Sequence, residues 1–307
     1  MIVRSSSAVL VAIWVQSAVW SPPTAPQAPA TFHAETRLVV LHATVKNSRG
    51  AEVADLDESA FRVYENGKRQ RITLFRRDDI PVSLGLLIDN SGSMRALRRR
   101  VEASALAFVR ASNPLDEVFV VNFADRPKLD VPFTSDVRQL EAGIARVDSI
   151  GGTAMRDAID MAEGYLAQHA AHDRRILLVV TDGRDNASTI TARQIQQTSE
   201  RIETAVYAIG VFSDPESANA RDGRRELDPL TQRTGGTAYY PTAVDEIDAI
   251  VRELARQIRN QYTIAYAPTN QALDGTYRRI RVEAHARDAL TVRTRAGYVA
   301  EPPRQKR

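Results

Sequence analysis

The chain has 307 residues, of which 43% are hydrophobic and 26% are charged, and its formal net charge is +3. This composition is typical of a globular protein with a substantial core, and so small an excess of positive charge does not indicate nucleic-acid binding. The sequence contains no cysteine, which excludes disulfide bonds, thiolate metal sites and a lipidated cysteine.

Residues 1–30 have the features of a secretory signal peptide followed by a Pro/Ala-rich segment. Arg4 gives a short positive start, residues 8–20 are mostly apolar, and Ser21-Pro22-Pro23 ends any helix. The apolar run is shorter than the roughly 20 residues that span a bilayer, and Ala28-Pro29-Ala30 offers small residues at a cleavage site. We predict export to the periplasm or secretion, without a stable membrane span after cleavage. An uncleaved membrane anchor is the alternative, and the cleavage site stays open.

The next segment, residues 31–79, is predicted to form β-strands. Residues 37–45 are rich in β-branched and apolar side chains. Alternating patterns at 61–65 and 69–75 flank Asn66-Gly67, a strong hairpin turn. Strands of this kind do not easily join a parallel sheet built by helical crossovers, so we expect a small antiparallel layer beside the main domain.

Strand and helix patterns alternate over residues 80–260. Such alternation predicts an α/β domain with a doubly wound, mostly parallel sheet. Arg95 and Arg98 to Arg100 are expected on a solvated helix face. Strands are predicted at 82–88, 118–123, 176–180, 205–211 and 238–240, and helices at 95–111, 136–147, 153–170, 191–202, 228–233 and 244–260.

Strand character returns in residues 261–300, with β-rich runs at 261–266, 277–283 and 290–294. We predict that this C-terminal segment and the N-terminal β segment form one joint antiparallel module flanking the α/β domain. Residues 301–307 are expected to be a disordered tail.

An oxygen-rich motif follows the first buried strand. The stretch Asp89-Asn90-Ser91-Gly92-Ser93 places one carboxylate and two hydroxyls on a single turn. These are hard oxygen donors, which Mg²⁺, Ca²⁺ and Mn²⁺ prefer. Thr153, after Gly151-Gly152, and Asp182 fall in loops near the C-terminal ends of strands, where open α/β sheets bind ligands. The turn after the first buried strand therefore offers three oxygen ligands for a hard divalent ion.

This set of motifs resembles the metal-ion-dependent adhesion site of von Willebrand factor type A domains, over residues 81–260. The resemblance implies a metal site formed by Asp89, Ser91, Ser93, Thr153 and Asp182. A narrower resemblance, through residues 61–67, 86–94, 151–154 and Gly297-Tyr298, is to secreted "VWFA-related" proteins abundant in acidobacteria. The resemblance implies that one coordination position stays open for an Asp or Glu of a protein partner. Mg²⁺ suits the site best because it favours octahedral oxygen coordination and keeps some waters, with Ca²⁺ or Mn²⁺ possible. The expected partner-binding rim comprises Asn90, Gly92, Gly152 and Asp185.

Catalysis is not expected, because no histidine lies near the motif to activate a serine. A metal-assisted hydrolase is an alternative, with Asp125, Asp185 or Glu226 as the candidate bases. A structural envelope protein, in which the ion only stiffens the loops, is another. The sequence names neither the partner nor its pathway, and the oligomeric state is not determined.

Overall fold

The computed structural model describes residues 37–77, 79–145, 150–182, 184–201, 203–243, 246–286 and 288–302. The predicted signal peptide lies outside this described part, as do residues 303–307 of the predicted tail. Within the described ranges, no helix is long and apolar enough to cross a membrane.

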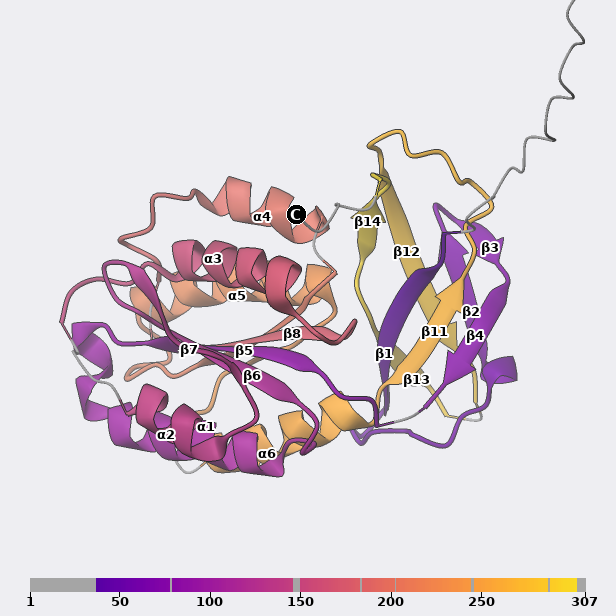
Figure 1. Ribbon diagram of the computed structural model, residues 1–307. Helices are drawn as coiled ribbons and strands as arrows, with labels where there is room; N and C mark the ends of the chain where they lie inside the picture. Colours follow the sequence, from indigo (N-terminus) through magenta and orange to yellow (C-terminus); the bar gives the residue numbers. More distant parts are fainter. Residues whose placement is uncertain are drawn as a thin grey trace, which may run out of the picture. The chain divides into compact units, whose positions relative to one another are not determined.

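A six-stranded sheet forms the centre of the α/β domain (Figure 1). Its middle strand, β5, pairs in parallel with β6 and β8, and β8 and β9 extend the parallel pairing to β10. The edge strand β7 is antiparallel to β6. The predicted mostly parallel sheet is therefore confirmed. In spatial order the strands are β10 (Ala238–Tyr239), β9 (Ala205–Gly210), β8 (Arg175–Thr181), β5 (Ser83–Asp89), β6 (Glu117–Phe123) and β7 (Pro127–Thr134).

Helices cover both faces of this sheet (Figure 1). Leu86 and Ile88 of β5 share a core with residues of α1 and α6, whereas Leu87 between them packs with residues of α3 and α5. Because β5 is buried on both faces, its sequence is almost continuously apolar. One face carries α1 (Arg98–Ala111), α2 (Val137–Ile144) and α6 (Glu246–Arg259), and the other carries α3 (Met155–His169), α4 (Ala192–Arg201) and α5 (Ala218–Thr234).

Two features of the helices differ from the sequence prediction. The helix predicted at 228–233 begins much earlier, because the hydroxyl of Ser217 accepts a 3.1 Å hydrogen bond from the Ala220 N–H and caps α5. Arg98 was expected on a solvated face, but it is buried. Its guanidinium donates to Glu102 Oε1 at 2.8 Å and to the carbonyl oxygen of Ile144.

The two ends of the described chain build one β module, as predicted. Strand β1 from the N-terminal side pairs with β11 and β13, and β2 pairs with β12. The module has two four-stranded antiparallel sheets that share one apolar core, where we expected a single layer. The first sheet contains β13 (Leu290–Arg293), β1 (Val39–Asn47), β11 (Tyr262–Tyr266) and β4 (Ile72–Arg76), and the second contains β14 (Gly297–Val299), β12 (Tyr277–Ala284), β2 (Phe61–Glu65) and β3 (Lys68–Gln70).

Polar contacts join the β module to the α/β domain. The side-chain amide of Gln261, between α6 and β11, donates to Tyr207 Oη at 2.9 Å and to Thr44 Oγ1 at 3.1 Å. Arg293 donates to the carbonyl oxygen of Gly236 at 2.9 Å. These contacts involve the segments that precede or begin β9, β10 and β11, away from the loops that follow β5 and β8.

Candidate metal centre

The first loop of the predicted site turns directly after β5. The backbone N–H of Asn90 donates to the carbonyl oxygen of Phe123 at 2.7 Å, which continues the pairing with β6 for one more residue. The N–H of Ser91 then donates to Asp89 Oδ1 at 2.8 Å, and this bond turns the carboxylate over its own loop. A short 3₁₀ helix, η2 (Gly92–Ala96), follows and leads into α1. Asp89 is completely buried, whereas Ser93 is exposed.

The second loop reaches the first through its backbone. The N–H of Gly92 donates to the carbonyl oxygen of Gly151 at 3.4 Å. Gly151 has a φ of +99°, and a Cβ at this position would overlap the carboxylate of Asp125, so only glycine suits this turn. Asp125 Oδ1 also accepts the Gly152 N–H at 2.6 Å. The loop is thereby fixed directly before Thr153, which is buried.

The third loop delivers Asp182 at the end of β8. Asp182 Oδ1 accepts a 3.0 Å hydrogen bond from Ser93 Oγ, which lies 3.1 Å from Ser91 Oγ. Thr181 Oγ1 donates to Asp89 Oδ2 at 2.6 Å. The structure therefore links four of the five predicted ligands, Asp89, Ser91, Ser93 and Asp182, through contacts between two loops.

Thr153 joins this group through its main chain. Its N–H donates to Asn186 Oδ1 at 2.8 Å, and its carbonyl oxygen accepts the Asn186 N–H at 3.0 Å. Among the described residues, no hydrogen bond joins its hydroxyl to the other four predicted ligands. The bonds at Thr153 and Gly151 thus tie the second loop to both the first and the third.

The electrostatics of the two acidic residues favour a bound cation. Burial raises the pKa of Asp89. Burial, followed by the neighbouring charge of Asp89, raises the pKa of Asp182 to about 6. Two desolvated carboxylates close together disfavour each other's ionised form, and a divalent cation would relieve that repulsion.

The types of donor also fit a hard divalent ion. Two carboxylates and three hydroxyls offer oxygen atoms only, which suits Mg²⁺, Ca²⁺ or Mn²⁺. In the described part of the chain, no group of three or more His, Cys, Asp or Glu side chains is placed to hold a metal. This finding does not conflict with the predicted set, because only two of its five residues are acidic and the other three are hydroxyl residues.

Residues 84–184 match the family model of the von Willebrand factor type A domain. The chain carries a von Willebrand factor type A domain. The matched range begins in β5 and ends just after Asp182, so it contains all three loops of the candidate site. The predicted fold and the resemblance at domain level are confirmed, whereas membership of the acidobacterial "VWFA-related" group stays a prediction.

Solved structures share this fold at low sequence identity. A von Willebrand factor type A protein from Catenulispora acidiphila is 14% identical with a TM-score of 0.50, and the match covers 87% of this chain and 75% of that one. Proximal thread matrix protein 1 from the mussel byssus, whose MIDAS motif is occupied by zinc, is 17% identical with a TM-score of 0.51. That match covers 64% of this chain and 50% of the mussel protein.

A minor pilin, PilB from Streptococcus sanguinis, is also similar, with 12% identity and a TM-score of 0.49. The match covers 60% of this chain and 62% of the pilin, so this chain spans less than two thirds of the pilin's length. No curated protein matches the sequence.

The predicted rim of the von Willebrand A domain divides into two kinds of residue. Gly92 is exposed and Gly152 is partly exposed, whereas Asn90 and Asp185 are buried. The Asp185 carboxylate accepts from the Arg156 guanidinium at 2.8 Å and from Ser188 Oγ at 2.6 Å. Asp185 therefore organises the third loop and does not face a partner.

Three supporting residues of the von Willebrand A domain had no predicted structural role: Thr181, Asn186 and Asp125. Each is polar, and each lies at or soon after the C-terminal end of β6 or β8. Thr181 orients Asp89, Asn186 holds the main chain of Thr153, and Asp125 holds Gly152. Polar residues at the strand ends were the available signal, but only the structure shows which loop each one contacts.

Proposed function

We propose that this von Willebrand A domain is an exported, metal-dependent protein-binding module that captures an acidic side chain of a partner. One observation carries the proposal: buried Asp89 and Asp182 lie at the end of a hydroxyl-lined path that reaches the surface at Ser93. The ion would be held on the buried side by carboxylates, and its other side would face solvent between Ser93 and Gly92.

Asp89, Asp182, Ser91, Ser93 and Thr153 are the residues that would hold the ion, with Mg²⁺ as the proposed species. The bound ion supplies a positive centre that attracts a carboxylate. Two protein carboxylates match the charge of one divalent cation, and the partner's acid would complete its coordination. The exposed backbone at Gly92 leaves room for the incoming side chain.

We favour binding over catalysis because of the contacts made by the three candidate bases. Asp125 holds the Gly152 N–H. Glu226 lies 3.9 Å from the Arg156 guanidinium, and although burial raises its pKa, this ion pair holds its carboxylate away from the metal ligands of the first loop. Burial alone would raise the pKa of Asp185, but hydrogen bonds from Arg156 and Ser188 outweigh burial and lower it. A carboxylate stabilised in its ionised form is a weak general base.

A pull-down from envelope extract tests the binding function. The protein without residues 1–30 would be immobilised and washed with Mg²⁺ or with EDTA, beside Asp182→Ala and the surface control Asp222→Asn. We expect a partner that the wild type and the control retain in Mg²⁺, and that EDTA or Asp182→Ala releases. A partner held equally under all conditions would contradict the metal-dependent capture.

Export is a separate part of the proposal, and it rests on the composition of residues 1–30. Cell fractionation followed by mass spectrometry of the intact protein tests it. We expect a shortened chain in the periplasm or the medium. A full-length chain in the cytoplasm would contradict export, and a full-length chain in the membrane fraction would support the uncleaved anchor.

A further inference from the structure

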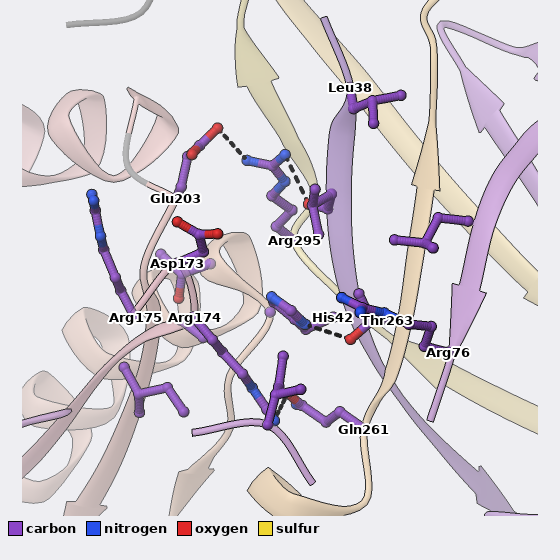
Figure 2. A pocket seen from close by; sticks show the side chains of 17 residues that line it. Leu38, His42, Arg76, Asp173, Arg174, Arg175, Glu203, Gln261, Thr263 and Arg295 are labelled. Atoms are coloured by element: carbon purple, nitrogen blue, oxygen red, sulfur yellow. Dashed lines mark hydrogen bonds and ion pairs between the residues drawn. The ribbon is translucent and has the colours of Figure 1, made fainter. Parts of the chain in front are cut away.

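A second site lies where the β module meets the α/β domain. A cavity of about 290 Å³ opens between β1, β4 and β11 on one side and the beginnings of β8 and β9 on the other. Figure 2 shows the side chains that line it. Because the metal loops follow the C-terminal ends of β5 and β8, this cavity lies at the opposite edge of the central sheet.

Positive charge dominates the cavity wall. Arg76, Arg174, Arg175 and Arg295 line it, and the acidic residues that line it are Asp173 and Glu203. Arg295 forms an ion pair with Glu203 at 3.6 Å, which Figure 2 shows.

Arg174 is the most deeply buried of these arginines, with 3% of its surface exposed. Its guanidinium donates to the carbonyl oxygen of Ile258 and to Gln261 Oε1, both of which are neutral. No carboxylate lies within ion-pair distance of Arg174 among the described residues. Burial lowers its pKa to about 10, so the guanidinium remains charged at neutral pH. A buried charge that forms no ion pair is costly. Asp116 and Asp79 act on Arg174 from a longer distance, and an anion in the cavity would reduce the remaining cost.

Unused hydrogen-bond donors point to the same chemistry. The Nε atoms of Arg174, Arg175 and Arg295 are buried, and none has a hydrogen-bond partner within the described residues. Buried donors are usually paired, so each of these unpaired donors is a place for an acceptor oxygen. Figure 2 shows that they lie on different parts of the wall, since Arg174 points towards Gln261 and away from Arg295. His42, on the same wall, adds no positive charge. Burial, then the charges of Arg174 and Arg295, lowers its pKa to about 3.

Part of the wall is apolar. Leu38, just before β1, and Val40 of β1 are among the most exposed large hydrophobic residues, at 49% and 41%, and Leu74 and Ile176 also line the cavity. Ligand pockets typically have volumes of about 300–1,000 Å³, and this cavity lies at the lower limit of that range, so only a small molecule would fit. We propose that the cavity binds a small organic acid, with its carboxylate against the arginine-lined part of the wall and its apolar body against Leu38 and Val40. This site does not depend on the metal.

Titration of benzoate into the full chain in EDTA tests the proposal, because EDTA removes the other centre that could attract a carboxylate. Because the chain has only five histidines, their imidazole signals can be resolved in an NMR spectrum. The signal of His42 can therefore be followed individually. We expect a saturable shift of the His42 resonance with benzoate and none with the neutral isostere benzamide. The site should remain intact in the Asp182→Ala protein.

Variants of two partly accessible arginines make the test specific. Arg175→Gln and Arg295→Gln should each weaken benzoate binding at least tenfold, and Arg175→Lys should restore part of it. An unshifted His42, or equal binding by the wild type and both Gln variants, would overturn the site. Inorganic phosphate that binds as tightly as benzoate would overturn the assignment to an organic acid.

Discussion

Thr181 on β8 donates a 2.6 Å hydrogen bond to Oδ2 of Asp89 on the adjacent strand β5. The Ser91 N–H donates to the other oxygen of the same carboxylate at 2.8 Å. The two oxygens of Asp89 are therefore oriented by donors from two different places, the end of β8 and the loop after β5.

Removal of this orienting hydroxyl should weaken metal binding without removing a ligand. We expect Thr181→Val, which conserves shape, to lower the affinity for Mg²⁺ by roughly 10- to 100-fold, as is typical when a group that orients a metal ligand is lost. Isothermal titration calorimetry measures this change. Thr276→Val in the exposed turn before β12 is the matched control. An unchanged affinity in Thr181→Val would show that Asp89 needs no such support.

The repulsion between Asp89 and Asp182 predicts opposite effects on stability and binding. Asp182→Asn removes one of two buried charges and keeps an oxygen for the Ser93 hydroxyl. In EDTA at neutral pH, we expect this variant to be more stable than the wild type by roughly 1 to 3 kcal/mol, since one pKa unit corresponds to about 1.4 kcal/mol. Urea unfolding measures it. The variant should also lose the stabilisation that Mg²⁺ gives the wild type, and a less stable variant in EDTA would contradict the predicted repulsion.

The ion pair between Arg156 and Asp185 should matter for folding of the third loop. The side chain of Arg156 is 15% exposed and that of Asp185 is 0% exposed, and Arg156 Nη2 lies 2.8 Å from Asp185 Oδ1. Asp185→Asn leaves the guanidinium with only the longer 3.9 Å ion pair to Glu226 in a largely buried place, and we expect a loss of up to about 3–5 kcal/mol in the free energy of unfolding. Asp222→Asn breaks the exposed pairs with Arg184 and Arg225, and it should cost less than about 1 kcal/mol. Equal losses in the free energy of unfolding for the two variants would contradict a structural role of the Asp185 ion pair in the third loop.

His42 should make stability depend on pH. Burial, together with the charges of Arg174 and Arg295, lowers its pKa from 6.5 to about 3, so the folded form stays neutral where the unfolded form takes up a proton. Stability should therefore fall as the pH decreases from 6.5 towards 3, by at most about 1.4 kcal/mol per pH unit for one proton. His42→Gln should flatten the pH profile from urea unfolding, and His285→Gln at an exposed position should not. If stability changed with pH equally in the wild type and in His42→Gln, the lowered pKa of His42 would be contradicted.

The sequence predicted the strands that are buried on both faces of the central sheet, because such strands have a nearly continuous apolar pattern. Strand β5 and the loop after it belong to this class, because a doubly buried strand must be apolar until the turn begins. Strand β7 was missed, since Pro127 and Asp130 do not follow an apolar alternation. An edge strand tolerates proline because one row of its N–H groups faces away from the sheet.

Other misses depended on contacts distant in sequence. The helix predicted at 228–233 extends back through Gly223 within α5, which also contains Pro229, although glycine and proline disfavour helix interiors. Arg98 appeared to belong to a solvated run of arginines, but it lies one turn before Val101 on the inner face of α1. Its carbonyl partner is on Ile144, far along the chain. The sequence alone gives no sign of that contact, nor of the burial of Asp185.

Calorimetric titration of Mg²⁺ into metal-free wild type and Asp182→Ala tests the central claim most directly, since Asp182 comes from a different loop than Asp89, Ser91 and Ser93. The account predicts one saturable site in the wild type and at least a hundredfold weaker binding in Asp182→Ala. Equal binding by the two proteins, or no binding of Mg²⁺, Ca²⁺ or Mn²⁺ by the wild type, would contradict a shared ion among these loops.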